Sequence, residues 1–191
     1  MLTVACVLSP GPGGYTRAHV ERLRGMVARH MVQEHRFVCI NDSPFPGWWA
    51  KVSLFEPGRF AGRILYLDLD VTVVGPLDDL AGYPQPFAAM KDPLYKGINS
   101  SVMVWTPSTD MDRLYTEFTP DVMKRLPGDQ DFIMRARSDI AYFPQDWCVS
   151  YKHQRFIRLK TIPRDARVIC YHGKPKPWGL PLDHLAEFRV V

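Results

Sequence analysis

Two carboxylates separated by a single residue, Asp68 and Asp70, follow an apolar run at residues 64–67. In extended backbone, side chains two residues apart point the same way, so both carboxylates could reach one cation. Hard divalent ions such as Mn²⁺ and Mg²⁺ prefer oxygen ligands of this kind. Because aspartate is also common where a strand runs into solvent, the pair alone leaves metal binding and an ordinary strand end as alternatives.

A second group of residues that could bind a ligand follows an apolar run at residues 168–171. His172 can supply a metal nitrogen, and Gly173 lets the backbone approach a ligand closely. Lys174 and Lys176 can neutralise phosphate. A lone histidine is more often an ordinary core or surface residue, but the adjacent glycine and lysines shift the balance toward a ligand site.

Two further segments carry small polar or acidic side chains. Asn99 and Ser100 lead into an apolar run, an arrangement that is also compatible with an ordinary turn. Asp129 begins a segment with helical patterning at residues 129–137. Asp129 could cap that helix by accepting bonds from its free N–H groups, so capping and catalysis are both open for this residue.

The elements that must position these residues alternate between strand and helix. An apolar run at 2–8 predicts a buried strand, a Gly- and Pro-rich loop spans 9–14, and apolar residues at spacings of three and four predict a helix at 15–31. The run at 64–67 lacks alternation, which indicates a strand buried on both faces of a mostly parallel sheet. Further strands are predicted at 35–40, 87–90, 102–105 and 168–171, and helices at 111–118 and 129–137. In such α/β sheets, ligands bind beyond the carboxyl ends of the strands, where these motifs fall.

The overall composition is that of a globular protein with a slight excess of positive charge. A chain that is 46% hydrophobic and 23% charged suits a single domain over residues 1–191. The apolar runs are too short to span a bilayer, and no cationic leader precedes one, so a cytoplasmic protein is expected. The four cysteines form no close sequence pair, which favours reduced core thiols over a zinc or redox site. The net charge of +4 suits an anionic ligand such as a diphosphate.

Taken in order, the four segments resemble the motifs of the glycogenin-like retaining glycosyltransferases of family eight, which have the GT-A fold. Residues 65–71 are similar to the family's Y-L-D-x-D-x-x-V, 99–104 to N-S-G-V-x-V, 129–131 to D-Q-D and 173–178 to G-x-x-K-P-W. The resemblance implies one α/β domain of GT-A type, Rossmann-like, with a mostly parallel mixed sheet flanked by helices, in a short bacterial or phage-type member. Two departures are that Ser101 stands where the family has glycine, and that His172 adjoins Gly173 where two residues usually intervene. The second departure bears on whether His172 reaches the metal.

The resemblance also implies an activity and a set of site residues. The activity is metal-dependent, retaining transfer of a sugar from a nucleotide-sugar donor, a UDP-sugar, to an acceptor that could be a glycan, a lipid-linked sugar, a protein or a nucleic acid. The implied ligands of Mn²⁺ or Mg²⁺ are Asp68, Asp70 and His172. The residues implied to bind the donor are Tyr15, Lys51, Asp68, Asp92, Asn99, Ser100, Gly173 and Lys176. Asp129 and Gln130 are implied to orient the acceptor and the sugar during catalysis.

Two other functions fit parts of the sequence. Residues 68–72 also match D-x-D-x-T, the aspartyl-phosphate signature of haloacid dehalogenase-type phosphatases, and Asp129 and Asp131 could supply their later acidic pair. That signature normally ends the first strand of its domain, whereas a strand-helix-strand unit precedes it here. A basic nucleic-acid-binding module is the other alternative, because arginines crowd the first predicted helix at Arg17, Arg22, Arg24 and Arg29. A solvated helix face explains the same arginines.

Overall fold

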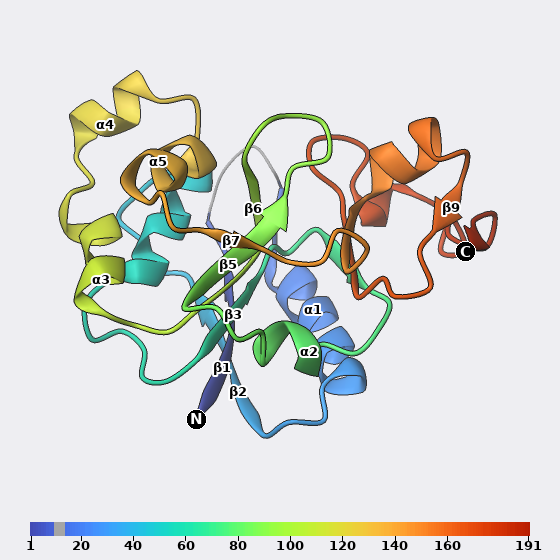
Figure 1. The fold of residues 1–191 in the computed structure, drawn as a ribbon, viewed down its shortest axis with the longest axis horizontal. Coiled ribbons are helices and arrows are strands. Elements are labelled where there is room, and N and C mark those ends of the chain that lie inside the picture. The colour runs from blue at the N-terminus through green and yellow to red at the C-terminus, as the bar shows by residue number, and fades with distance from the viewer. Residues whose placement is uncertain (10–13) are drawn as a thin grey trace.

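A mixed six-stranded sheet forms the centre of the protein, for which a computed structural model describes residues 1–9 and 14–191 (Figure 1). Its strands lie in the order β2-β1-β3-β6-β5-β7. Their bounds are β1 Leu2–Val7, β2 His35–Ile40, β3 Ile64–Leu67, β5 Phe87–Lys91, β6 Ile98–Trp105 and β7 Ala141–Tyr142. β6 runs antiparallel to β3 and β5, and the other pairs are parallel. The predicted α/β fold with a mostly parallel mixed sheet is therefore confirmed.

Helices cover both faces of this sheet. Figure 1 shows α1 (Arg17–His30) and α2 (Asp78–Ala81) on one face. The other face carries the 3₁₀ helix η1 (Gly47–Phe55) together with α3 (Thr109–Thr116), α4 (Pro120–Arg125) and α5 (Asp129–Ala136). The side chains of β3 alternate between the two layers, because Leu65 and Leu67 pack with α1 whereas Ile64 and Tyr66 pack with η1. All four are at most 1% exposed, as expected for a strand buried on both faces.

A smaller sheet brings the last part of the chain beside the central one. It consists of β4 (Val71–Val73), β10 (Val168–Cys170) and β8 (Cys148–Ser150), with β10 in the middle. β4 directly follows β3 in the chain, and Val71 pairs with Cys170 of β10. Residues just after β10 are therefore held next to residues just after β3. The remaining elements are the π-helical turn η2 (His153–Ile157), the pair β9 (Thr161–Ile162) and β11 (Arg189–Val190), and η3 (Pro177–Gly179).

The structure shifts several predicted boundaries. The helix predicted from residue 15 begins at Arg17, because Thr16 is still in extended backbone. The Thr16 N–H donates a hydrogen bond to His19 Nδ1 at 2.9 Å. The strand predicted at 102–105 begins at Ile98, so Asn99 and Ser100 belong to β6 and not to a turn. Of the predicted loop at 9–14, residues 10–13 lie outside the described residues. Within the described part, none of the helices combines the length and apolarity needed to cross a bilayer.

Gly75 lies where the chain leaving β4 passes the segment that precedes β10. Its N–H donates to the Arg167 carbonyl at 3.2 Å, and a Cβ on Gly75 would lie only 2.4 Å from the Ala166 carbonyl oxygen. We expect Gly75→Ala to lower the free energy of unfolding by about 1–3 kcal/mol, because backbone must move to relieve the overlap. Urea denaturation measures this loss. Gly179→Ala is the matched control, since its Cβ would meet no described atom within 4 Å; an equal loss in both variants would contradict the explanation.

Candidate functional site

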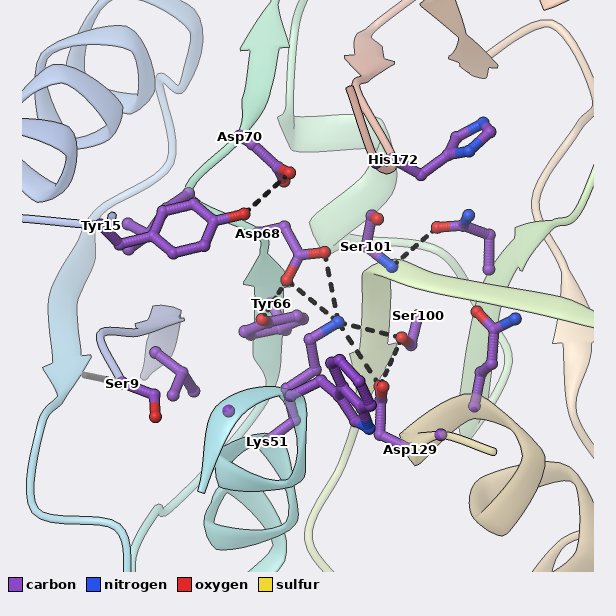
Figure 2. A pocket seen from close by; sticks show the side chains of 18 of the residues that line it. Ser9, Tyr15, Lys51, Tyr66, Asp68, Asp70, Ser100, Ser101, Asp129 and His172 are labelled. Atoms are coloured by element: carbon purple, nitrogen blue, oxygen red, sulfur yellow. Dashed lines mark hydrogen bonds and ion pairs between the residues drawn. The ribbon is translucent and has the colours of Figure 1, made fainter. Parts of the chain in front are cut away.

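Several chain segments end or begin at one edge of the central sheet. β1 and β3 are parallel, so their carboxyl ends reach the same edge, and the antiparallel β6 begins there. The Asp68 N–H donates to the Ser101 carbonyl at 2.9 Å, which joins the end of β3 to the start of β6. A cavity of about 730 Å³ opens at this edge (Figure 2). Its position agrees with the rule that ligands of open α/β sheets bind beyond the strand ends.

The cavity brings together residues from all four sequence motifs. Its lining includes the predicted residues Tyr15, Lys51, Asp68, Asp70, Asn99, Ser100, Asp129, Gln130, His172, Gly173 and Lys176. Asp92 is the exception: it is buried and is not among the described lining residues. It accepts the backbone N–H groups of Leu94 and Tyr95 at 2.8 and 2.9 Å, and Asn99 Nδ2 approaches it at 3.5 Å. Asp92 is therefore a neighbour of Asn99, which does line the cavity.

Lys51, from η1, is the centre of a buried polar network. Its Nζ lies 3.1 Å from Asp68 Oδ1 and 3.4 Å from Asp129 Oδ2, and it donates to Ser100 Oγ at 3.0 Å (Figure 2). Tyr66 donates a hydrogen bond to Asp68 from within β3. Burial by itself lowers the pKa of the Lys51 ammonium, but the charges of Asp129, Asp68 and Asp70 outweigh it and raise that pKa overall. Lys51 is therefore a fixed cation that holds Asp68 and Asp129 in place.

Asp129 does not cap the helix that it begins. The N-cap residue of α5 is Gly128, with no side-chain cap bond, and Asp129 is the first helical residue. Its carboxylate instead accepts the Ser100 hydroxyl at 2.5 Å and faces Lys51. The capping explanation is thus wrong for Asp129, because the carboxylate turns into the cavity wall.

Asp70 has different partners from Asp68, although both line the cavity. Residues 69 and 70 form a turn between β3 and β4, so the expectation of extended backbone through Asp70 was wrong. Asp70 accepts the Tyr15 hydroxyl at 2.9 Å and forms an ion pair with Lys176. Burial and the nearby charge of Asp68 raise the pKa of Asp70, although Lys176 and Tyr15 act in the opposite direction. Burial and Asp70 likewise raise the pKa of the Tyr15 phenol, which keeps it a hydrogen-bond donor.

His172 lines the cavity, but its ring is directed elsewhere. Its Nε2 lies 2.6 Å from Ser150 Oγ, and Figure 2 shows the imidazole pointing away from Asp70. Burial lowers the pKa of His172, which favours the neutral ring, the form in which histidine binds metals. Within the described residues, no three His, Cys, Asp or Glu side chains are gathered closely enough to hold a metal ion. The ligand set of Asp68, Asp70 and His172 therefore stays a prediction.

Sequence reasoning missed some of the lining residues. Tyr66 precedes Asp68 by two positions, and this spacing on a strand could have indicated a side chain on the same side. Trp48 precedes Lys51 by three positions, the repeat of a 3₁₀ helix, so both reach the cavity from η1. The 3₁₀ conformation of η1 was not predicted. Without it, the spacing of three residues does not indicate that Trp48 and Lys51 share one side of the helix.

The architecture is shared with solved glycosyltransferases of low sequence identity. Neither models of known protein families nor the sequences of curated proteins match this chain. The glycosyltransferase GlyE from Streptococcus pneumoniae TIGR4 matches with a TM-score of 0.63 and 16% identity, over 93% of this chain and 56% of the GlyE chain. The galactosyltransferase LgtC, solved with donor and acceptor sugar analogs, matches with a TM-score of 0.62 and 13% identity, over 97% of this chain and 94% of the LgtC chain. A glycosyltransferase involved in glycosylation of the major capsid of PBCV-1 matches with a TM-score of 0.63 and 14% identity, over 97% of this chain and 98% of that chain. This chain thus has the fold of these enzymes, while spanning little more than half of GlyE.

Proposed function

We propose that this protein is a metal-dependent retaining glycosyltransferase that uses a nucleotide-sugar donor, of which a UDP-sugar is the first to test. The observation that carries the proposal is that the four motif segments, far apart in the chain, line one cavity at the carboxyl edge of the sheet. The cavity combines carboxylates suited to a divalent cation with the half-buried Lys176, whose ammonium suits a diphosphate. The shared fold with solved glycosyltransferases supports the same conclusion.

The donor would lie along the polar residues at the cavity floor. Tyr15 would contact the base, and Lys176 would exchange its ion pair with Asp70 for the diphosphate. Asp68, Asp70 and His172 would hold Mn²⁺ or Mg²⁺, which requires His172 to turn away from Ser150. Two carboxylates and a neutral imidazole are suitable ligands for Mn²⁺, and the bound ion supplies electrostatic stabilisation of the leaving diphosphate.

The sugar would lie beside the network around Lys51. Asn99 and Ser100 line that part of the cavity, and Asp129 and Gln130 would orient the sugar and the acceptor. The bond between the anomeric carbon and the phosphate oxygen breaks through a short-lived oxocarbenium-like state. The acceptor oxygen then bonds to that carbon on the face that the diphosphate leaves, and its proton passes to the departing phosphate oxygen. Retention of configuration follows from attack on that face.

The two alternative functions receive less support from the geometry. A phosphatase of the haloacid dehalogenase type would leave His172 without a role, although it lines the same cavity as Asp68. A nucleic-acid surface on α1 would need free arginines. Arg22 donates to the Val71 carbonyl and to Thr72 Oγ1 at 2.9 and 3.0 Å, and the Arg24 guanidinium lies 4.5 Å from the centre of the Phe37 ring.

Donor hydrolysis tests the proposed function without knowledge of the acceptor. We expect the protein with Mn²⁺ to release nucleoside diphosphate slowly from one or a few nucleotide sugars, and not after chelation of the metal with EDTA. Proton NMR of the first-formed free sugar from an α-linked donor should show the α anomer. A β anomer would indicate inversion, and no hydrolysis of any nucleotide sugar tested would contradict the proposed function itself.

A further inference from the structure

Trp48 exposes an aromatic face at the rim of the cavity. It is 56% exposed although it lines the cavity, whereas its neighbour Trp49 is 6% exposed and belongs to the core. Trp48 and Lys51 are one 3₁₀ turn apart on η1, so the indole stands on the same side of that helix as the buried ammonium. An indole left in water contributes little to folding, since apolar surface stabilises only when it is removed from water. Its position is that of a contact surface for a ligand.

Polar groups surround the edge of this indole. A Cβ on Gly128 would lie 3.9 Å from Trp48 Nε1 and 3.6 Å from Asp131 Oδ2, so the indole N–H and the carboxylate flank the bare backbone of Gly128. Gln130 lines the cavity beside them. Carboxylates accept hydroxyl protons, and an amide side chain both donates and accepts. An aromatic face with such groups at its edge matches a pyranose, whose C–H face packs on the ring while its hydroxyls bond outward.

The opposite end of the cavity is the one suited to the donor. Tyr15 donates to Asp70 at one end, whereas Lys51 joins Asp68 to Asp129, and Figure 2 shows Tyr15 and Asp129 on opposite sides of Asp68. Lys176 pairs with Asp70 at the Tyr15 end. The Trp48 end instead adds the carboxylate of Asp131, which repels phosphate by like charge. A diphosphate thus favours the Tyr15 end, and an uncharged polyhydroxylated ligand favours the Trp48 end.

We propose that Trp48, Gln130 and Asp131 form the acceptor subsite and that it binds a pyranose residue of a carbohydrate acceptor. This inference rests on the proposed function. The subsite adjoins Asp129 and Ser100, so a sugar stacked on Trp48 presents a hydroxyl toward the part of the cavity where the donor sugar would lie. Trp48 is a binding residue in this scheme and takes no part in donor activation.

The test compares Trp48→Ala with Trp48→Phe, which keeps an aromatic face. The probes are the methyl glycosides of glucose, galactose, mannose and N-acetylglucosamine, added to the protein with Mn²⁺ and nucleoside diphosphate. Saturation-transfer NMR should show at least one glycoside bound to the unaltered protein. Trp48→Ala should weaken its affinity at least tenfold, about 1.4 kcal/mol, and Trp48→Phe by less than threefold. Phe156→Ala is the matched control, because Phe156 is 67% exposed and lies on η2, outside the described cavity lining.

The donor reactions separate the two possible failures. Phe156→Ala should keep the nucleoside diphosphate affinity and the rate of donor hydrolysis of the unaltered protein. In Trp48→Ala, the nucleoside diphosphate affinity is measured beside the glycoside affinity. If Trp48→Ala binds the glycoside as tightly as the unaltered protein, the subsite is overturned and the proposed function still stands. The same holds if the protein hydrolyses a donor but binds no glycoside. Weaker nucleoside diphosphate binding in Trp48→Ala would assign the indole to the donor and also overturn the subsite. A protein that hydrolyses no nucleotide sugar would fail at the proposed function instead.

Discussion

Asp70→Asn is expected to weaken Mn²⁺ binding in the presence of nucleoside diphosphate at least tenfold and to slow donor hydrolysis by about 10²–10³. Asp70 is 5% exposed, lies in the turn after β3 and carries the charge that a cation would need. Asparagine has the same shape but no charge, so the cation loses its attraction while the hydrogen-bond geometry to Tyr15 is retained. Isothermal titration with Mn²⁺ and nucleoside diphosphate measures the binding loss.

The fold should tolerate this substitution. Burial and the charge of Asp68 raise the pKa of Asp70, so removing the charge relieves the repulsion from Asp68 while it costs the ion pair with Lys176. Asp129→Asn is the matched control, because Asp129 lies in the same cavity but is assigned to the sugar and acceptor and not to the metal. Asp129→Asn should keep most of the metal affinity. Equal metal affinities for the unaltered protein and Asp70→Asn would remove Asp70 from the ligand set.

Local patterns predicted the parts of the fold that depend on nearby residues. The apolar run at 64–67 became a strand buried on both faces, and the spacing of Val20, Leu23 and Val27 placed them on the buried face of α1. The motif residues line one cavity, but parallel strand ends explain only the place of Asp68, because Asn99 and Ser100 begin the antiparallel β6 and His172 follows β10 of the smaller sheet. Asp92 was the exception, since a short loop after β5 turns it toward backbone N–H groups.

Contacts between distant segments could not be predicted in the same way. The bond between His172 and Ser150 depends on the pairing of β10 with β8, and no local pattern specifies that pairing. The different partners of Asp68 and Asp70 follow from a turn that the D-x-D spacing does not reveal. The place of Trp48 in the cavity lining follows from the 3₁₀ conformation of η1. The apolar residues of this segment fit a strand or an α-helix equally well, so the sequence does not predict that conformation.

Removing the cation at the centre of the site should affect both stability and activity. Lys51→Met keeps the length of the side chain but leaves the carboxylates of Asp68 and Asp129 without their shared partner. The Lys51 side chain is 12% exposed, and breaking a buried pair by removing one partner costs about 3–5 kcal/mol. We expect the urea midpoint of Lys51→Met to fall accordingly and donor hydrolysis to fall by about 10²–10³, because Asp68 and Asp129 lose their positions.

The comparison of Lys51→Arg with Lys51→Met separates the charge from the rest of the side chain. Arginine restores the charge, so Lys51→Arg should recover most of the stability, and it should recover activity only as far as the guanidinium still reaches Asp68, Ser100 and Asp129 together. Lys124→Met is the control for loss of a lysine charge, because Lys124 is exposed on α4 and its replacement should change the unfolding free energy by less than about 0.5 kcal/mol. Unchanged stability and hydrolysis in Lys51→Met would show that Asp68 and Asp129 hold their positions without the cation. The network around Lys51 would then be a consequence of the fold, and the Lys51 charge would not be what positions the carboxylates of the site.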